Sequence, residues 1–423
     1  MPKPVAEMLA ARALQAAATW RREAMLPLLA TNLAVMLSVR HGDDPLSAVT
    51  GQDQSVGARA FRFATLIYGR AQDDWYHRGR SHVGTSVLPG VLSVECDDIF
   101  GPVAAGYAAM MAVAGTYGVQ AHTHALRPTS MFGGIGTATA AGCALGLGEQ
   151  AIARALGFAL VGSCGHSQCM IEGTDEWRYE VANGLRAGAE GAALAQGTAV
   201  AARQTFEGEA GWAAAHFDDP DASRLRQTLA EPPEPIDRVT VKPWPASGVA
   251  MATIATAASL GGAHNRAMPE RLQVACSPAV VAIPGSLGRP PYHGQIGAAM
   301  SLARCAAEAY LTGTMRSAPL PADQAPIAAL DARSFVVADP ALADGTARIE
   351  AWLDGRRVVA EGDAEALLRP SARDIRDHAD DVAARYEVPA ETFRALLQLL
   401  AAARVPSATL RDFLMAHLAQ PAA

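Results

Sequence analysis

Small and apolar residues recur at helical spacing through roughly the first 260 residues of the chain. Four segments place Ala, Leu, Gly and Val at positions i, i+3 and i+4, the pattern of helices that bury one face: 106–121, 136–148, 149–163 and 184–204. Because so many of these residues are Ala or Gly, we expect neighbouring helices to approach closely. No run of alternating β-branched residues occurs in this part, so the pattern predicts an all-α region.

The pattern changes after a Pro-rich segment, residues 229–245, and one more apolar helix expected at about 248–260. Short strand-like runs then occupy 271–285, 334–340 and 347–363, and helical spacing returns at 294–313 and from Arg373 to the end. The run at 347–363 contains Asp354-Gly355, a pair typical of a hairpin turn. This part is therefore expected to mix strands and helices.

These patterns predict a mainly α protein, with a large all-α helical domain and a second, smaller α+β domain. The length of 423 residues supports two domains, because one hydrophobic core rarely keeps growing at that size. The predicted ranges are 1–262 for the first part of the all-α domain, 263–370 for the α+β domain and 371–423 for C-terminal helices that rejoin the all-α domain.

Composition narrows the class of protein further. Half of the residues are hydrophobic and 18% are charged, which is typical of a compact, well-buried and oligomeric protein rather than a disordered one. The net charge of −7 and the lack of a basic tract argue against nucleic acid and anionic membranes as partners.

Two further features predict a cytoplasmic protein that spans no membrane. Residues 1–27 lack the uninterrupted apolar run of a signal peptide, and the apolar segment 130–165 is interrupted by Glu149, Gln150 and Arg154, which favours buried helices. The six cysteines lack the spacing of a zinc site, so free thiols in a reducing compartment are expected.

Lys242, in the stretch VKPWP, stands out among the basic residues. The chain has 35 Lys and Arg residues, and only Lys3 and Lys242 are lysines. A lysine can lose its proton when burial lowers its pKa, whereas an arginine cannot, and its compact ammonium fits where a planar guanidinium clashes. The alternative is retention by chance, and we treat Lys242 as a candidate catalytic residue.

A polar loop at 71–90 concentrates carboxylates and imidazoles before an apolar helix. It contains Asp73, Asp74, Arg80 and His82. Adjacent carboxylates can orient a histidine or share a proton with it, which makes the aspartates and His82 candidates for proton transfer. Alternatively, the aspartates cap the helix that follows.

A third polar cluster combines His122, His124 and Arg127 with Pro128-Thr129 at the start of a Gly-rich helix. Free N–H groups at a helix N-terminus, a hydroxyl group and an arginine together predict an anion site. The His-x-His spacing lacks a further ligand at a suitable distance along the chain, so no metal is expected. The chain also lacks GxSxG, P-loop and HExxH motifs, which argues against hydrolase, NTPase and zinc-protease functions.

Taken in order, four segments resemble the MmgE/PrpD family, which includes 2-methylcitrate dehydratase, cis-aconitate decarboxylase and iminodisuccinate epimerase. Residues 71–90 are similar to the family's loop of clustered aspartates followed by a His and a Leu-Pro, and 126–148 to its His-Pro-Thr segment opening a Gly/Ala helix. VKPWP resembles its Lys-x-x-Pro element, and 298–313 resembles the helix of its smaller domain. The likeness covers about residues 55–365.

The resemblance implies a discontinuous all-α domain, a smaller α+β domain and an active site between them, in a homodimer without metal or organic cofactor. The family's chemistry acts at carbon that bears or adjoins a carboxylate, by loss of water, loss of CO₂ or epimerisation. Such chemistry needs a cationic pocket, because removing a proton beside a carboxylate builds negative charge. The residues retained at matching positions are Asp73, Asp74, His82, Thr129 and Lys242.

The chain departs from the family's pattern at other positions of the implied site. The family's Asp, Thr, His, Lys and Tyr are replaced by Ala71, Trp75, Arg127, Trp177 and Arg304, with Arg178 next to Trp177. Several groups that could exchange protons are therefore absent. The arginines that replace two of them can hold carboxylates but cannot give up a proton.

Two functions are compatible with this pattern. The first is a lyase (a hydro-lyase or decarboxylase) or an isomerase that moves a proton next to a carboxylate on a small polycarboxylic acid. Lys242 or His82 would be the base, and Asp73 or Asp74 would orient it. Five residues would bind the substrate: Trp75, Arg127, Thr129, Arg178 and Arg304.

The second possibility is a diverged member of the family in which the usual dehydratase or decarboxylase chemistry is lost. Such a protein would act on a less polar biosynthetic substrate or would only bind an anion. Trp75, Trp177 and Met251 support this alternative, because they place large apolar groups at positions of the implied pocket.

Overall fold

The structure, a computed structural model, describes residues 2–39, 46–50, 53–317, 321–363 and 372–418. It is mainly helical and contains two small sheets within these ranges, so the predicted fold class is confirmed at this level. No helix in the described ranges combines the length and the apolar character needed to cross a membrane. The division into domains at 262 and 370 stays a prediction.

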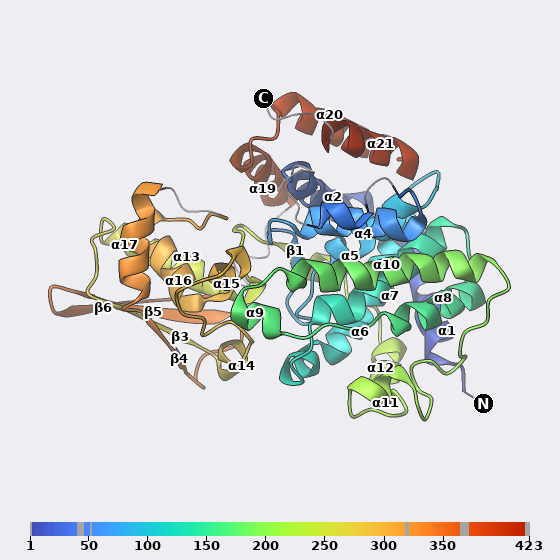
Figure 1. Ribbon diagram of the computed structural model, residues 1–423, viewed down its shortest axis with the longest axis horizontal. Coiled ribbons are helices and arrows are strands. Elements are labelled where there is room, and N and C mark those ends of the chain that lie inside the picture. The colour runs from blue at the N-terminus through green and yellow to red at the C-terminus, as the bar shows by residue number, and fades with distance from the viewer. Residues whose placement is uncertain (1, 40–45, 51–52, 318–320, 364–371, 419–423) are drawn as a thin grey trace.

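Helices dominate the chain up to residue 230, as their apolar spacing predicts (Figure 1). Their bounds are α1 Val5–Thr19, α2 Arg22–Leu37, α3 Ser47–Thr50, α4 Val56–Tyr68, α5 Val83–Ser93, α6 Phe100–Thr123, α7 Pro128–Ala144, α8 Glu149–Val161, α9 Gln168–Glu172, α10 Glu176–Gln196, α11 Trp212–His216 and α12 Ser223–Ala230. The helix predicted over 184–204 ends at Gln196, because Gly197 takes an extended conformation there.

Close contact between α7 and α10 explains the small residues on both helices. A Cβ atom added to Gly134 would lie 2.8 Å from the carbonyl oxygen of Gly184, and one added to Gly188 would lie 2.4 Å from that of Gly134. Real side chains do not approach backbone this closely, so only glycine allows the two helices to touch. The predicted close approach of Gly-rich helices is confirmed here.

One correction concerns the region expected to be all-α. It contains strands β1 Asp74–Tyr76 and β2 Val239–Val241, which pair antiparallel with Asp74 opposite Val241. Strands of three residues are too short to show the alternation of apolar and polar residues that identifies a strand in a sequence. The 3-10 turn η2 Ile236–Arg238 precedes β2. After β2 the chain continues through the 3-10 turn η3 Gly248–Ala250 and the helix α13 Met251–Ala263.

The second sheet has four strands in the order β4-β3-β5-β6 (Figure 1). β3 pairs parallel with β4 and antiparallel with β5, and β5 and β6 form the hairpin predicted at Asp354-Gly355, where both residues have positive φ angles. The bounds in this part are β3 Leu272–Cys276, α14 Pro278–Val281, α15 Gln295–Met300, α16 Leu302–Thr312, α17 Pro321–Asp331, β4 Phe335–Ala338, β5 Thr346–Leu353 and β6 Arg356–Asp363. The single helix predicted over 294–313 is interrupted at Ser301, whose side chain caps α16.

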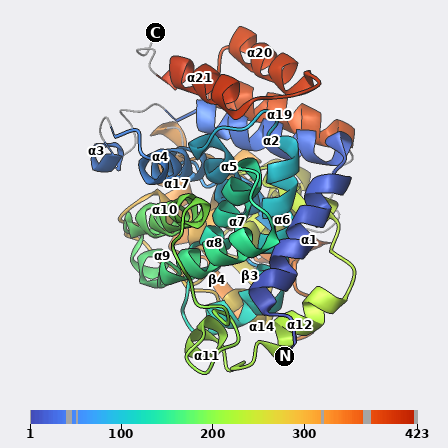
Figure 2. The ribbon, with the colours of Figure 1, turned by 90° about the vertical axis from the view of Figure 1, so that its right-hand side faces the viewer.

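The last three helices, α19 Ala372–Arg385, α20 Ala390–Ala401 and α21 Ser407–Leu418, return to the helical part of the chain. Figures 1 and 2 show them along the upper side of the molecule, beside α2. Val382, Leu396 and Leu410 belong to the same buried cluster as residues of α2, α5 and α6. A second buried cluster joins α4 and α10 to α13, α16 and the four-stranded sheet.

Candidate active site

β1 and the residue before it send alternate side chains to opposite sides, as expected of an extended chain. Asp73 points toward His82 and Lys242, two residues that line a small cavity. Trp75 lines the same cavity. Asp74 points the other way, where its carboxylate accepts a hydrogen bond from the Tyr107 hydroxyl at 2.6 Å.

The carboxylate of Asp73 lies between an imidazole and an ammonium group. Its Oδ2 is 3.1 Å from Nδ1 of His82, and its Oδ1 is 3.2 Å from Nζ of Lys242. Thr85 also donates a hydrogen bond from its hydroxyl to Oδ2. All four side chains are buried. Asp73, His82 and Lys242, which are separated in the sequence, thus form one compact charged cluster with Thr85.

The pKa values of this cluster follow from burial and from the opposite charges. Burial alone would raise the pKa of Asp73, but the charges of His82 and Lys242 and the hydrogen bonds from His82 and Thr85 lower it to about 2. Burial lowers the pKa of Lys242 and that of His82, and in both cases the charge of Asp73 opposes the shift. At neutral pH Asp73 is therefore ionised and His82 is neutral.

The backbone determines which nitrogen of His82 carries the proton. Nδ1 lies 2.8 Å from the carbonyl oxygen of Asp74, and a carbonyl oxygen can only accept a hydrogen bond. Nδ1 is thus the protonated nitrogen of the neutral ring, and Nε2 keeps a lone pair that can accept a proton. His82 is consequently placed as a base whose imidazolium form would be stabilised by Asp73.

Lys242 is held by three oxygen atoms. Its Nζ lies 2.5 Å from the carbonyl oxygen of Ala71 and 3.3 Å from that of Ala246, in addition to Asp73. Three acceptors match the three N–H groups of an ammonium ion. These three acceptors stabilise the ammonium form against the effect of burial, which lowers the pKa of Lys242, and they hold Nζ next to Asp73.

Asp74 has a structural role that separates it from Asp73. Its carboxylate accepts hydrogen bonds from the backbone N–H of Gly84 at 2.9 Å, in the first turn of α5, and from the Asn32 side chain at 3.2 Å. Burial raises its pKa to about 6. Of the two alternatives open for the aspartate pair, Asp73 orients the histidine and Asp74 caps the helix.

The cavity beside His82 is small and has mixed walls. Its volume is about 60 Å³. One side is polar and comes from the helical part of the chain, and the other side is apolar and includes Ile283, Ile296 and Met300 from the part around α14 and α15. The buried apolar residues that line it, on both sides, belong to the second buried cluster.

Two further predicted residues, Arg127 and Thr129, lie at this cavity. Arg127 donates to the Tyr68 hydroxyl at 2.9 Å and has Glu180 at 3.9 Å, and the hydroxyl of Thr129 accepts a hydrogen bond from the backbone N–H of His82 at 3.3 Å. Tyr68 was not predicted from the sequence, because a tyrosine in the last turn of an apolar helix carries no signal of its own.

The structure does not bring Arg178 and Arg304 to this cavity. Arg178 pairs with Asp175 at 2.9 Å, and its guanidinium lies over the ring of Trp177. Arg304 forms a buried pair with Glu308 at 2.7 Å, one turn further along α16. Both guanidinium groups therefore have intramolecular carboxylate partners, and the geometry gives no support to their predicted role in substrate binding.

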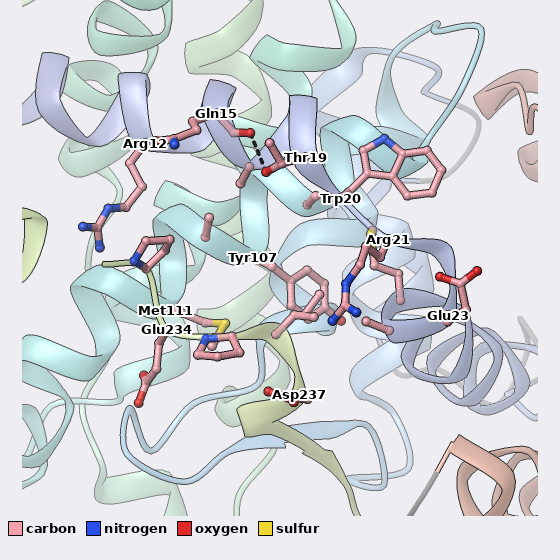
Figure 3. Close-up of a pocket in the computed structure, with 18 residues that line it drawn as sticks. Arg12, Gln15, Thr19, Trp20, Arg21, Glu23, Tyr107, Met111, Glu234 and Asp237 are labelled. Atoms are coloured by element: carbon pink, nitrogen blue, oxygen red, sulfur yellow. Dashed lines mark hydrogen bonds between the residues drawn. The ribbon is translucent and has the colours of Figure 1, made fainter. Parts of the chain in front are cut away.

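A larger cavity, of about 480 Å³, lies on the other side of β1. Figure 3 shows Tyr107 at its centre, with Arg12, Arg21 and Glu234 around it. Tyr107 lines this cavity and binds Asp74 through its hydroxyl, but Asp73, His82 and Lys242 are not among the lining residues. Its size alone does not make it the candidate active site.

The described part of the chain contains no group of three or more His, Cys, Asp and Glu side chains arranged to hold a metal ion. In comparisons with known proteins, residues 29–225 match the family model of the MmgE/PrpD N-terminal domain. No curated protein matches the chain. The matched range includes Asp73, His82 and Arg127 but ends before Lys242.

Proposed function

This chain belongs to the MmgE/PrpD family, and on that premise we propose that it is a lyase or isomerase that moves a proton at a carbon next to a carboxylate. The proposed substrate is a small polycarboxylic acid, and the reaction is dehydration, decarboxylation or epimerisation without a cofactor. We further propose that the protein acts as a homodimer.

The observation that carries this proposal is the position of Asp73 between His82 and Lys242. In the proposed reaction Nε2 of His82 removes the proton from the substrate carbon. The ionised Asp73 stabilises the resulting imidazolium, as the third member of a base-orienting triad does. The cations Lys242 and Arg127 offset the negative charge that develops next to the substrate carboxylate.

The size of the cavity requires one further step in this proposal. A volume of about 60 Å³ is well below the several hundred Å³ typical of ligand pockets. We therefore propose that the part around α14 and α15 moves away from the helical part when substrate enters. Closure afterwards would exclude water from the His82 cluster.

A second candidate function is favoured by the apolar wall of the cavity. Trp75, Met170, Ile283, Ile296 and Met300 all line it. A substrate with a substantial apolar portion would fit this wall better than citrate, so the alternative proposal is a diverged member of the family that acts on a less polar carboxylic acid.

Proton exchange in D₂O tests the proposed chemistry. Citrate, cis-aconitate and aspartate are incubated with the protein and followed by NMR, and exchange or conversion of at least one of them is expected. His82→Asn keeps a donor near the Nδ1 position but removes the proton acceptor, and should slow the reaction about 10²–10⁴-fold. Unchanged turnover in this variant would rule out His82 as the base.

A further inference from the structure

A second polar corner of the small cavity is formed by Arg80, His122 and Arg127. All three line the cavity together with His82 and Lys242. Nδ1 of His122 is buried and has no hydrogen-bond partner among the described residues. Buried polar atoms in folded proteins nearly always have a partner, so an unpaired nitrogen in a cavity wall indicates a position where a ligand atom binds.

The two arginines determine the charge of the missing partner. Both guanidinium groups are buried. Burial, together with the charges of Arg80 and Arg127, lowers the pKa of His122 to about 3, so its ring is neutral at neutral pH. A neutral imidazole in the same cavity wall as two guanidinium groups can donate a hydrogen bond to an anion, and the arginines attract that anion.

The protein supplies hydrogen-bond acceptors for only some of the N–H groups of Arg80 and Arg127. Arg80 donates to Asp344 and lies 3.2 Å from Nε2 of His77. Arg127 donates to Tyr68 at 2.9 Å and to Cys169 at 3.6 Å, with Glu180 at the longer distance of 3.9 Å. A guanidinium group has five N–H donors, so these contacts leave donors for a further acceptor.

We propose that Arg80, His122 and Arg127 form a second carboxylate subsite of this cavity, in which His122 donates from Nδ1 to a carboxylate oxygen. The inference deepens the proposed function: it requires a substrate with two carboxylates, one beside the His82–Asp73–Lys242 cluster and one at this corner. Arg80 and His122 are then specificity-determining residues. They act on binding, whereas His82 acts on the proton.

Succinate and butyrate form a matched pair of probes, because both have four carbons and only succinate has two carboxylates. Isothermal titration calorimetry of the full chain should show that succinate binds at least about tenfold more tightly than butyrate, as expected for charge-assisted hydrogen bonds to a second anion. His122→Leu should weaken succinate binding about tenfold and leave butyrate binding unchanged.

Three variants make the result specific. His122→Asn places an amide nitrogen near the position of Nδ1 and should keep most of the preference for succinate. Arg80→Gln should reduce that preference as His122→Leu does, and it covers the case in which the leucine variant does not fold. His124→Leu is the control, because His124 lies outside the cavity and contacts the carbonyl oxygen of His216.

Equal affinities of the wild-type protein for succinate and butyrate, or no succinate binding at millimolar concentration, would overturn the subsite. An equal loss of affinity for succinate and for butyrate in His122→Leu would also overturn it. The proposed function fails separately: His122-dependent succinate binding without proton exchange on any acid would overturn the chemistry and leave the subsite standing. Proton exchange by a protein that does not prefer succinate over butyrate would support the proposed chemistry and overturn the subsite.

Discussion

At the scale of one residue, the surroundings of Lys242 explain why this position is a lysine in a chain whose other basic residues are almost all arginine. Its ammonium is fully buried and is surrounded by Asp73 and two backbone carbonyl groups. A guanidinium is larger and planar, and its donors cannot converge on three acceptors around one nitrogen. The shape of the site and its three acceptors therefore favour a lysine over an arginine at this position.

Lys242→Arg is expected to lower the rate of proton exchange at least about 100-fold and to destabilise the protein by about 1–3 kcal/mol, because the larger group displaces Asp73 in a closely packed site. The measurements are NMR exchange rates and chemical denaturation. Lys3→Arg is the matched control, since Lys3 is half-exposed and pairs with Glu149 at the surface. Full turnover in Lys242→Arg would show that the proposed role of this lysine is wrong.

Asp74 allows a test by pH. Its folded-state pKa of about 6 lies above the ordinary value of 3.8, so its contribution to stability is fully present below pH 3.8 and is lost as the pH rises through 6. Relative to Asp74→Asn, the wild-type protein should therefore gain up to about 3 kcal/mol of unfolding free energy between pH 7 and pH 4. Urea denaturation at each pH measures the difference. A difference that does not change with pH would contradict the assigned pKa.

At the scale of elements, a short turn determines how far Trp75 reaches into the cavity. Gly248, in η3, packs its backbone against the indole ring, and a Cβ atom added there would lie 2.2 Å from the ring. The ring of Trp75 also lies 5.0 Å from that of His82, centroid to centroid. The β1–η3 contact therefore positions one wall of the site.

Gly248→Ala should push Trp75 toward His82 and reduce both stability and ligand binding. The expected loss of stability is about 1–3 kcal/mol, the usual effect of overpacking. Denaturation followed by tryptophan fluorescence and succinate titration measure the two effects. Gly262→Ala, at an exposed position of α13 with space around it, is the control and should leave both unchanged or slightly stabilise the helix. Wild-type binding by Gly248→Ala would show that the turn does not shape the cavity.

At the scale of the whole molecule, segments that are far apart in the chain together form the candidate site. Arg80 in the helical part binds Asp344 in the connection between β4 and β5, and the apolar wall of the cavity comes from the part around α14 and α15. Tyr386, just after α19, hydrogen-bonds Gln72 at 2.5 Å, so the C-terminal helices contact the residue next to Asp73. Three distant regions of the sequence thus support one site.

The proposed homodimer can be tested at this scale. Light scattering coupled to size-exclusion chromatography should give a mass twice the chain mass of 44.0 kDa, at micromolar concentration. The physical basis is the composition, which is half hydrophobic and low in charge, together with the family resemblance. A single species of 44.0 kDa over the whole accessible concentration range would contradict the proposal.

Much of the fold follows from local pattern. Helices of the N-terminal half, the hairpin at Asp354-Gly355 and the C-terminal helices were predicted because periodicity and turn residues act over a few positions. The pair β1–β2 and the break at Ser301 were not predicted, because three-residue strands and a single capping residue leave too short a signal.

The sequence by itself determined which chemistry was possible: one of only two lysines, at position 242, an Asp pair near a histidine, and arginines in place of the proton-exchanging groups of the family. Only the tertiary structure decided which aspartate serves the site, that Arg178 and Arg304 lie elsewhere, and that Arg80 and His122 join Arg127. The reason is that residue types are a local property, whereas distance, burial and the resulting pKa values depend on chain segments brought together from more than 150 positions apart, as with Asp73 and Lys242.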